Sequence, residues 1–189
     1  MAETRVEPVA PGEVTGRLRR EIVELHAAAH GRDPDGPREA VFGNDTLARH
    51  SARIGYSFVG AFDPGGRLAG FAYGYTGAPG QWWHDHVALG LSDEERRHWL
   101  EESPFELCEI AVRPDRQGTG VGGRLHDALL AGRPEPRALL STAAEENEDV
   151  IAFYERRGWQ IVLPLLRFPT APEPYCVLGR EPAAVPLPA

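Results

Sequence analysis

The sequence predicts an α/β protein, a single domain with a mixed central sheet of about six to seven strands flanked by about four helices. Short apolar and aromatic runs alternate along the chain with stretches of helical spacing, which is the pattern of a sheet covered by helices. The length of 189 residues, with 42% apolar and 25% charged side chains, is that of one globular domain. Because no repeat or linker divides the chain, we expect one domain over residues 1–180 and a disordered, Pro-rich tail over residues 181–189.

The first half of the chain is expected to contain one strand, two helices and a β-hairpin. Asn44 or Asp45 is the expected N-cap of the second helix. In the hairpin, two aromatic and aliphatic runs flank the sequence DPGG, which is typical of a tight turn. These four elements are predicted at residues 4–10 (strand), 15–31 (helix), 44–53 (helix) and 56–77 (hairpin).

The second half begins with a long connection over residues 78–103, whose second part has helical spacing. Ser92 and Glu95 form a capping-box pattern at the start of that helix. Gly158 is expected to end a later helix, because glycine readily adopts the left-handed conformation that terminates helices. The other elements are predicted at residues 104–112, 136–143, 159–168 and 175–181 (strands) and at residues 121–132 and 147–158 (helices).

Composition narrows the classes of function. A net charge of −8 repels phosphate backbones, so we expect no nucleic-acid partner, and a cationic small molecule or peptide suits this charge better. Cys108 and Cys176 lie in apolar runs and indicate small core residues rather than a disulfide framework. The N-terminal sequence lacks a signal-peptide pattern, and no run reaches the ~18 apolar residues of a membrane span. We therefore expect a cytoplasmic protein without a membrane partner.

Four glycines within six residues lie between a predicted strand and a predicted helix. Gly118, Gly120 and Gly123 match the dinucleotide-binding pattern G-x-G-x-x-G, and Glu145 follows at roughly the distance of the acid in that pattern. A nicotinamide-dependent oxidoreductase is thus one interpretation, although a dinucleotide domain needs more βα units after its glycine turn than this chain provides. A P-loop is excluded, because no Gly-Lys-Ser/Thr follows the glycines.

Taken from Gln117, the same segment is QGTGVG and follows a strand that ends in Val112-Arg113-Pro114. It resembles the pyrophosphate loop of the GNAT superfamily of acyl-CoA-dependent N-acyltransferases, and the predicted order of elements is similar to the GNAT fold over nearly the whole chain. Backbone N–H groups at a helix start can bind a pyrophosphate if no side chain blocks its approach. A glycine-rich helix start without a ligand is the alternative. The resemblance implies that acetyl-CoA contacts the strand end and this loop, at Ile110, Ala111, Val112, Gln117, Gly118, Thr119, Gly120, Val121 and Gly122.

The helix predicted over residues 147–158 carries a second resemblance to the family, in Asn147, Ala152, Phe153-Tyr154 and Gly158-Trp159. Asn147 and Tyr154 are two helical turns apart and are expected to share a helix face. The resemblance implies that Asn147 contacts the pantetheine arm and that Tyr154 protonates the departing thiolate, which a phenol is able to do. The alternative is that Tyr154 is a core aromatic residue with its hydroxyl at the rim.

An amine must lose a proton before it attacks a thioester, and the strand before the loop carries two candidate bases, Glu106 and Glu109. Because they are three positions apart, they point to opposite faces of a regular strand unless a bulge intervenes. In the family a carboxylate on this strand serves as base or holds a water, and we favour Glu109. The resemblance also implies that the N–H near Ala111 or Val112 polarises the thioester carbonyl. A glutamate that is solvent-facing or salt-bridged is the alternative.

The connection over residues 78–103 is longer than in a minimal family member and holds three of the four tryptophans. Trp82 and Trp83 are predicted to wall the acceptor pocket, with Asp85 attracting a cation. The alternative is a helix whose apolar face covers the sheet edge.

No metal site is expected. His84, Asp85 and His86 are consecutive and cannot easily converge on one ion, because neighbouring residues of a strand point apart. The other histidines are scattered and show no pattern: His26, His30, His50, His98 and His126.

Together these patterns predict an N-acetyltransferase that moves an acetyl group from acetyl-CoA, its co-substrate, to a primary amine of a small molecule or peptide. The amine attacks the thioester directly in a ternary complex, since Cys108 has no feature that would lower its pKa for a covalent route. A non-catalytic acyl-CoA sensor on the same fold and a nicotinamide oxidoreductase are the alternatives. A homodimer is an expectation from the resemblance alone.

Overall fold

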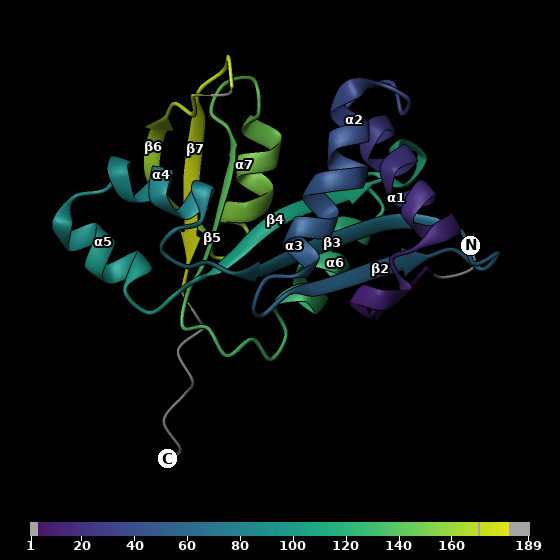
Figure 1. Ribbon diagram of the computed structural model, residues 1–189, viewed down its shortest axis with the longest axis horizontal. Coiled ribbons are helices and arrows are strands. Elements are labelled where there is room, and N and C mark those ends of the chain that lie inside the picture. Colours follow the sequence, from purple (N-terminus) through teal and green to yellow (C-terminus); the bar gives the residue numbers. More distant parts are fainter. Residues whose placement is uncertain (1–3, 170, 182–189) are drawn as a thin grey trace. The chain divides into compact units, whose positions relative to one another are not determined.

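The computed structural model describes residues 4–169 and 171–181 (Figure 1). The predicted tail lies outside these residues, apart from Glu181. The strands are β1 (Arg5–Pro8), β2 (Ser57–Phe62), β3 (Leu68–Thr76), β4 (Phe105–Val112), β5 (Ala138–Ala143), β6 (Gln160–Leu166) and β7 (Tyr175–Arg180). The helical segments are η1 (Pro11–Glu13), α1 (Gly16–Ala29), α2 (Pro37–Val41), η2 (Phe42–Thr46), α3 (Leu47–Ser51), α4 (Trp82–Gly90), α5 (Asp93–Leu100), η3 (Pro114–Arg116), α6 (Val121–Leu130) and α7 (Glu148–Glu155).

The seven strands form one mixed sheet in the order β1-β2-β3-β4-β5-β7-β6. β1, β2 and β3 pair antiparallel, β4 and β5 pair in parallel, and β7 pairs antiparallel with both β5 and β6. The predicted mixed sheet is therefore confirmed at the upper end of its expected strand number. The helices are more numerous than the expected four or so, because the 78–103 connection forms two helices rather than one.

The chain divides into two compact units. Unit 1 contains Met1–Tyr75 and Leu107–Gly132, and unit 2 contains Thr76–Glu106 and Arg133–Ala189. The boundary runs through β4, whose first two residues belong to unit 2.

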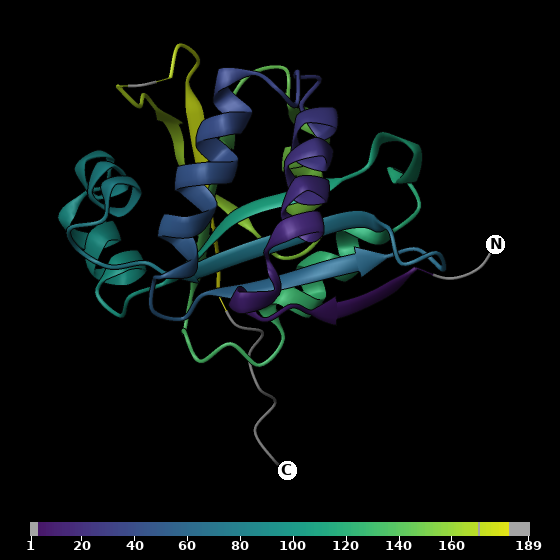
Figure 2. The same ribbon diagram turned by 45° about the vertical axis from the view of Figure 1, so that its right-hand side comes forward.

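Unit 1 has helices on both faces of its strands. α1 and the helix that runs from α2 to α3 cover one face of β2 and β3, and α6 covers the other (Figure 2). The apolar stripe predicted for α1 supplies Ile22 and Leu25 to a core in which Phe58 and Phe71 stack across β2 and β3, with ring centroids 5.5 Å apart. Burying such a side chain fully contributes about 1.5–3 kcal/mol, so this face fixes α1 against the sheet.

The predicted start of the second helix is wrong. Asn44 and Asp45 lie inside a continuous helix that begins at Pro37, with Gly36 as its N-cap residue. Proline suits the first helical position, because its fixed φ is helical and its missing N–H would have no intrahelical partner there. The segment from Phe42 has the wider π-helical turn before α3 continues.

Unit 2 contains β5, β6, β7 and the helices α4, α5 and α7. Its apolar core includes Val87, Leu91 and Trp99 from the 78–103 connection and Leu139 and Val177 from the strands. The capping box predicted for α5 is confirmed: the Ser92 hydroxyl accepts from the Glu95 N–H (3.3 Å), and the Ser92 N–H donates to the Glu95 carboxylate (2.8 Å). The connection thus covers the strands of unit 2, which is the structural role that the sequence left open.

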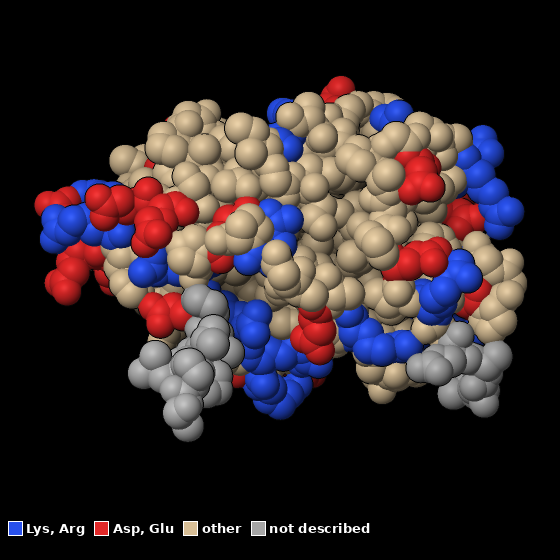
Figure 3. Space-filling view, turned by 90° about the horizontal axis from the view of Figure 1, so that it is seen from below, with Lys and Arg blue, Asp and Glu red and all other residues tan. Residues whose placement is uncertain are grey.

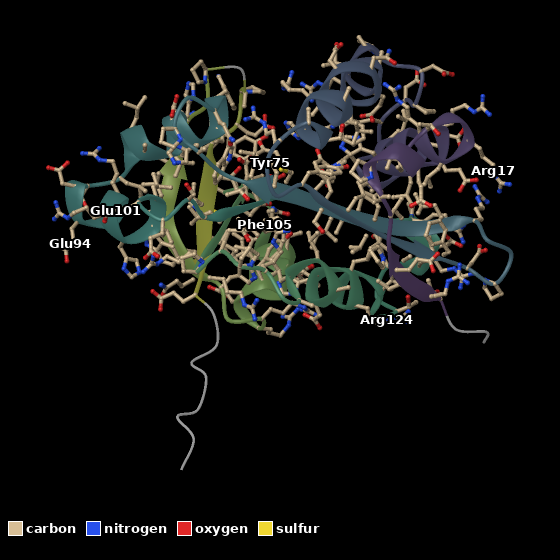
Figure 4. All side chains as sticks on the ribbon, turned by 60° about the horizontal axis from the view of Figure 1, so that its bottom comes forward. Arg17, Tyr75, Glu94, Glu101, Phe105 and Arg124 are labelled. Carbon is tan, nitrogen blue, oxygen red and sulfur yellow. The ribbon has the colours of Figure 1, made fainter. Side chains whose placement is uncertain are left out.

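The segment from Trp82 to Gly90 is a helix, so the expectation that His84, Asp85 and His86 are neighbours on a strand is wrong. Glu94 of α5 and Glu101, the residue that ends this helix, are exposed and point outward from the surface (Figure 4). Acidic and basic side chains are interleaved at the α5 end of the face shown in Figure 3.

Among the described residues, no helix combines the length and the apolar character that a membrane crossing requires.

Candidate active site

The glycine-rich loop of unit 1 joins β4 to α6. Gly118 and Gly120 have φ values of +71° and +85°, a backbone conformation that side chains other than glycine's rarely adopt. The Gln117 side chain donates to the carbonyl of Val112 (3.1 Å), and the Thr119 hydroxyl donates to the carbonyl of Arg116 (2.6 Å). The side chains of the loop therefore bind back to the loop itself.

Open space lies beside the two left-handed glycines. A Cβ atom placed on Gly118 or Gly120 would meet no other atom within 4 Å. Gly120 is the N-cap residue of α6, and Val121, the first helical residue, is buried. The first N–H groups of a helix have no intrahelical acceptor and carry the positive end of the helix dipole. An anion can therefore approach this helix start closely.

Helix α6 is fixed within unit 1 at its second turn. Arg124, labelled in Figure 4, donates to the carbonyl of Thr4 just before β1 (2.7 Å). The strand residues predicted beside acetyl-CoA lie before the loop: Ala111 is buried, and Ile110 and Val112 are half-buried. The strand end, the loop and the start of α6 thus form one continuous segment of unit 1.

Glu109 of β4 lies against two histidines of α1. One carboxylate oxygen is 3.4 Å from Nε2 of His26, and the other is 3.4 Å from Nε2 of His30. On its other side, His26 donates from Nδ1 to the carboxylate of Glu39 (2.5 Å), and its ring stacks on Phe42. Glu109 is therefore within ion-pair distance of two histidines, as the alternative of a salt-bridged glutamate predicts.

The charges of this group shift one another's pKa values. Burial disfavours the ionised carboxylate of Glu109, but hydrogen bonding and charge from His26 and His30 outweigh burial and lower its pKa to about 2. Burial alone would lower the pKa of His26, and the carboxylates of Glu109 and Glu39 outweigh it and raise that pKa. Glu109 is thus ionised at neutral pH.

The two candidate bases differ in access. The Glu106 residue is 5% exposed and belongs to unit 2, whereas the Glu109 side chain is 20% exposed and belongs to unit 1 with the glycine-rich loop. An incoming amine reaches a partly exposed carboxylate more readily than a buried one, and this favours Glu109.

Sequence reasoning missed the role of His26 and His30 beside Glu109. They are four positions apart on α1, so both side chains lie on one helix face, and this spacing was a usable signal. One ligand atom from each of these three residues lies within 4.8 Å of the others, close enough to share one ion.

Asn147 and Tyr154 lie in unit 2, at the two ends of α7. The expectation that they share a helix face is wrong in one respect: Asn147 is the N-cap residue, with non-helical backbone angles. Its side-chain amide donates to the hydroxyl of Thr142 (2.6 Å), which ties the start of α7 to β5. Tyr154 is buried, and its ring packs edge-to-face on Trp159.

The residues predicted to wall the acceptor pocket are not equivalent. Trp82 is 47% exposed and packs beside His86 and Phe168. Trp83 instead joins the apolar core of unit 2 and donates from its indole N–H to the Ser141 hydroxyl (2.9 Å). Asp85 accepts from the N–H of Gly80 (3.0 Å) and so fixes the turn before α4.

Comparison with protein families gives a match over most of the chain. The model of the acetyltransferase (GNAT) family matches residues 19–159. A GCN5-like protein acetyltransferase from Mycobacterium tuberculosis H37Rv is 41% identical over 119 residues, which cover 60% of this chain and 58% of that protein. The chain therefore matches less than two thirds of this relative's length.

Solved structures share the fold at low sequence identity. A protein from Pyrococcus horikoshii OT3 superposes with a TM-score of 0.68 and 16% identity over 96% of this chain and 99% of its own. A structure from Corynebacterium glutamicum described as "histone acetyltransferase HPA2 and related acetyltransferase" gives a TM-score of 0.65 and 18% identity over 98% and 99% of the two chains. At these identities the likeness supports the fold alone.

Proposed function

The chain belongs to the acetyltransferase (GNAT) family, and on that premise we propose that it transfers an acetyl group from acetyl-CoA to a primary amine of a small molecule or peptide. The observation that carries this proposal is the glycine-rich loop at the start of α6. Its two left-handed glycines leave open space beside unpaired helix N–H groups, which suits the pyrophosphate of coenzyme A. The main-chain amides from Gln117 to Gly122 would donate to it, and Asn147 would contact the pantetheine arm.

In the proposed reaction the amine attacks the thioester directly. Glu109 accepts a proton from the incoming ammonium group, either itself or through a water, so that the nitrogen lone pair becomes available. The nitrogen bonds to the thioester carbonyl carbon, and the oxyanion accepts a hydrogen bond from the backbone N–H near Ala111 or Val112. The C–S bond then breaks and Tyr154 protonates the departing thiolate. The nitrogen gives up its second proton, which restores the Tyr154 phenol directly or through water, and the products are coenzyme A and an amide.

A peptide amine is the acceptor class that the comparisons favour. The Mycobacterium tuberculosis relative, which is 41% identical over 58% of its own length, is named a protein acetyltransferase. Of the residues predicted at the acceptor site, Trp82 has the exposed ring that could contact a cation, while Trp83 has a structural role.

The first test separates coenzyme A binding from transfer. Acetyl-CoA or coenzyme A at ~100 times its dissociation constant should raise the unfolding free energy by about 2.7 kcal/mol, and NADH should not. No thermal shift with either coenzyme A species would overturn the proposal. A shift with NADH alone would instead favour the oxidoreductase.

The second test follows free thiol released from acetyl-CoA with a panel of amines and lysine peptides. Tyr154→Phe should lower kcat by about 10²-fold while the thermal shift with coenzyme A persists, because the variant loses only the acidic proton. Binding of coenzyme A without transfer to any amine would indicate the acyl-CoA sensor.

A further inference from the structure

We propose that Nε2 of His26, Nε2 of His30 and a carboxylate oxygen of Glu109 bind a divalent transition-metal ion, with Zn²⁺ as the best match. Imidazole and carboxylate are zinc ligands, and three protein ligands leave a fourth position for water or substrate. The sequence predicts no metal site, because the consecutive His84, Asp85 and His86 cannot easily converge and the other histidines show no pattern there. The structure brings two of those other histidines together.

The spacing along the chain suits this site. His26 and His30 are at positions i and i+4 of α1, the spacing by which two histidines on one helix face bind zinc. Glu109 comes from β4 and supplies the third ligand from a different element of unit 1. All three candidate ligand atoms lie within 4.8 Å of one another.

The interatomic distances fit ligands of one ion better than direct hydrogen bonds. Each histidine Nε2 is 3.4 Å from an oxygen of Glu109. Charge-assisted N–H···O bonds are usually about 2.7–2.9 Å long. Two ligands at about 2.0–2.1 Å from a tetrahedral zinc ion are ~3.4 Å apart, which is the separation between each histidine nitrogen and its own, different oxygen of Glu109.

A buried carboxylate orients the first histidine for this role. His26 donates from Nδ1 to Glu39 at 2.5 Å, and the Glu39 side chain is only 1% exposed. With one proton held at Nδ1 by Glu39, an ion can take the place of the Nε2 proton that otherwise faces Glu109, and such carboxylate–histidine–metal arrangements raise metal affinity. Phe42 stacks on the same ring at 3.8 Å between centroids and limits its rotation.

The second histidine provides access. The His30 side chain is 38% exposed, so an ion can enter the site from solvent without unfolding α1. Bound at Glu109, the ion would occupy the proposed base; zinc is therefore expected to inhibit acetyl transfer, a consequence that rests on the proposed function. Metal binding itself does not depend on it.

The test measures zinc binding to the tag-free full chain, by competition with a chromophoric chelator and without any acyl substrate. The wild type should bind one equivalent. His30→Ala should weaken binding at least ~10-fold, and because His30 is half-exposed this variant is expected to fold. His98→Ala, which removes an exposed histidine of α5 in unit 2, is the matched control and should bind as the wild type does.

Two further measurements complete the test. Glu39→Gln should weaken zinc binding about 10–100-fold if it orients His26. Co²⁺ should give the visible absorption bands of a tetrahedral site in the wild type and not in His30→Ala. Absence of stoichiometric binding, or binding that His30→Ala leaves unchanged, overturns the metal site. Zinc binding in a chain that shows no acetyl transfer would leave the site in place and contradict only the proposed function.

Discussion

His84, Asp85 and His86 are adjacent in the sequence, whereas His26, His30 and Glu109 come from a helix and a distant strand. In the first group, side chains at consecutive positions of α4 point in different directions. His86 binds the carbonyl of Trp82 (2.6 Å), and Asp85 binds the turn before the helix. Nδ1 of His84 lies 3.4 Å from the Asp85 carboxylate, but His86 is bonded elsewhere, so the three do not converge on one centre.

The second group does share a centre. His26 and His30 are one helical turn apart, and β4 places the Glu109 carboxylate between them. Residues that are adjacent in the sequence are thus poor evidence for a site, and helical spacing is better evidence. To predict this group from the sequence, one would need to know which strand faces α1, and no local sequence pattern gives that.

The largest expected effect is on catalysis. Glu109→Gln keeps the shape of the side chain and removes its ability to accept a proton, so kcat/KM should fall by about 10²–10⁴-fold. Steady-state thiol release measures it, with the exposed Glu94→Gln of α5 as control. Full activity of Glu109→Gln would move the base to Glu106 or to a water.

The next effect is on stability and compares the two histidine groups directly. His26→Ala should lower the unfolding free energy by roughly 3 kcal/mol, because Glu39 loses its 2.5 Å partner and keeps only Arg32, whose guanidinium is 3.6 Å from the other carboxylate oxygen. His86→Ala should change it by about 1 kcal/mol or less, since that side chain is only half-buried and bonds to a carbonyl of its own helix. Urea denaturation with a chelator present measures both, and equal losses would contradict the difference drawn between the groups.

His50 differs from both groups, because its neighbours are arginines and tyrosines and, among the described residues, no carboxylate stabilises its charged form. Burial, with the charges of Arg49 and Arg53, lowers the pKa of His50 from 6.5 to about 4. Between these two pH values the unfolded chain takes up a proton that the folded chain does not. The unfolding free energy should therefore fall by up to about 3 kcal/mol as the pH decreases from 6.5 to 4.

His50→Gln tests this in the same pH range. Carboxylates also titrate in this pH range and change the unfolding free energy of both proteins. The informative quantity is therefore the difference in unfolding free energy between the wild type and the variant at each pH. That difference should change steadily below pH 6.5 and be constant above it. A constant difference at every pH would mean that His50 titrates normally in the folded protein.

Much of the fold was predictable because local rules set it. The DPGG turn, the capping box at Ser92 and the glycine-rich loop are each specified by a few neighbouring residues. The start of the second helix was not predicted, since Asn44 is an equally good N-cap by its chemistry and only the structure shows that Pro37 begins the helix. The order of the strands and helices that carry the candidate site was predicted. The histidines of α1 that lie against Glu109 were not.

The two units differ in how far the sequence identifies their functional residues. In unit 1 the loop from Gln117 to Gly122 is proposed to act through its backbone, so the glycine spacing, read together with Gln117 and the strand before it, is enough to suggest its role. In unit 2 the roles of Trp82 and Trp83 depend on which side of α4 faces the strands. Consecutive tryptophans cannot both face the core of a helix layer, and the sequence does not say which one does.

The smallest effect tests that last distinction. Trp82→Ala should raise the KM for the acceptor about 2–5-fold, the scale of an exposed cation–π contact of about 0.5–1 kcal/mol, and leave the KM for acetyl-CoA unchanged. Trp83→Ala should instead lower the unfolding free energy by roughly 3 kcal/mol, because it removes a ring from the unit 2 core and its bond to Ser141. Initial-rate kinetics with each substrate varied, together with urea denaturation, separates the two effects. If Trp82→Ala raises both KM values or neither, its exposed ring does not contact the acceptor, and the binding role that the sequence assigned to both tryptophans belongs to neither.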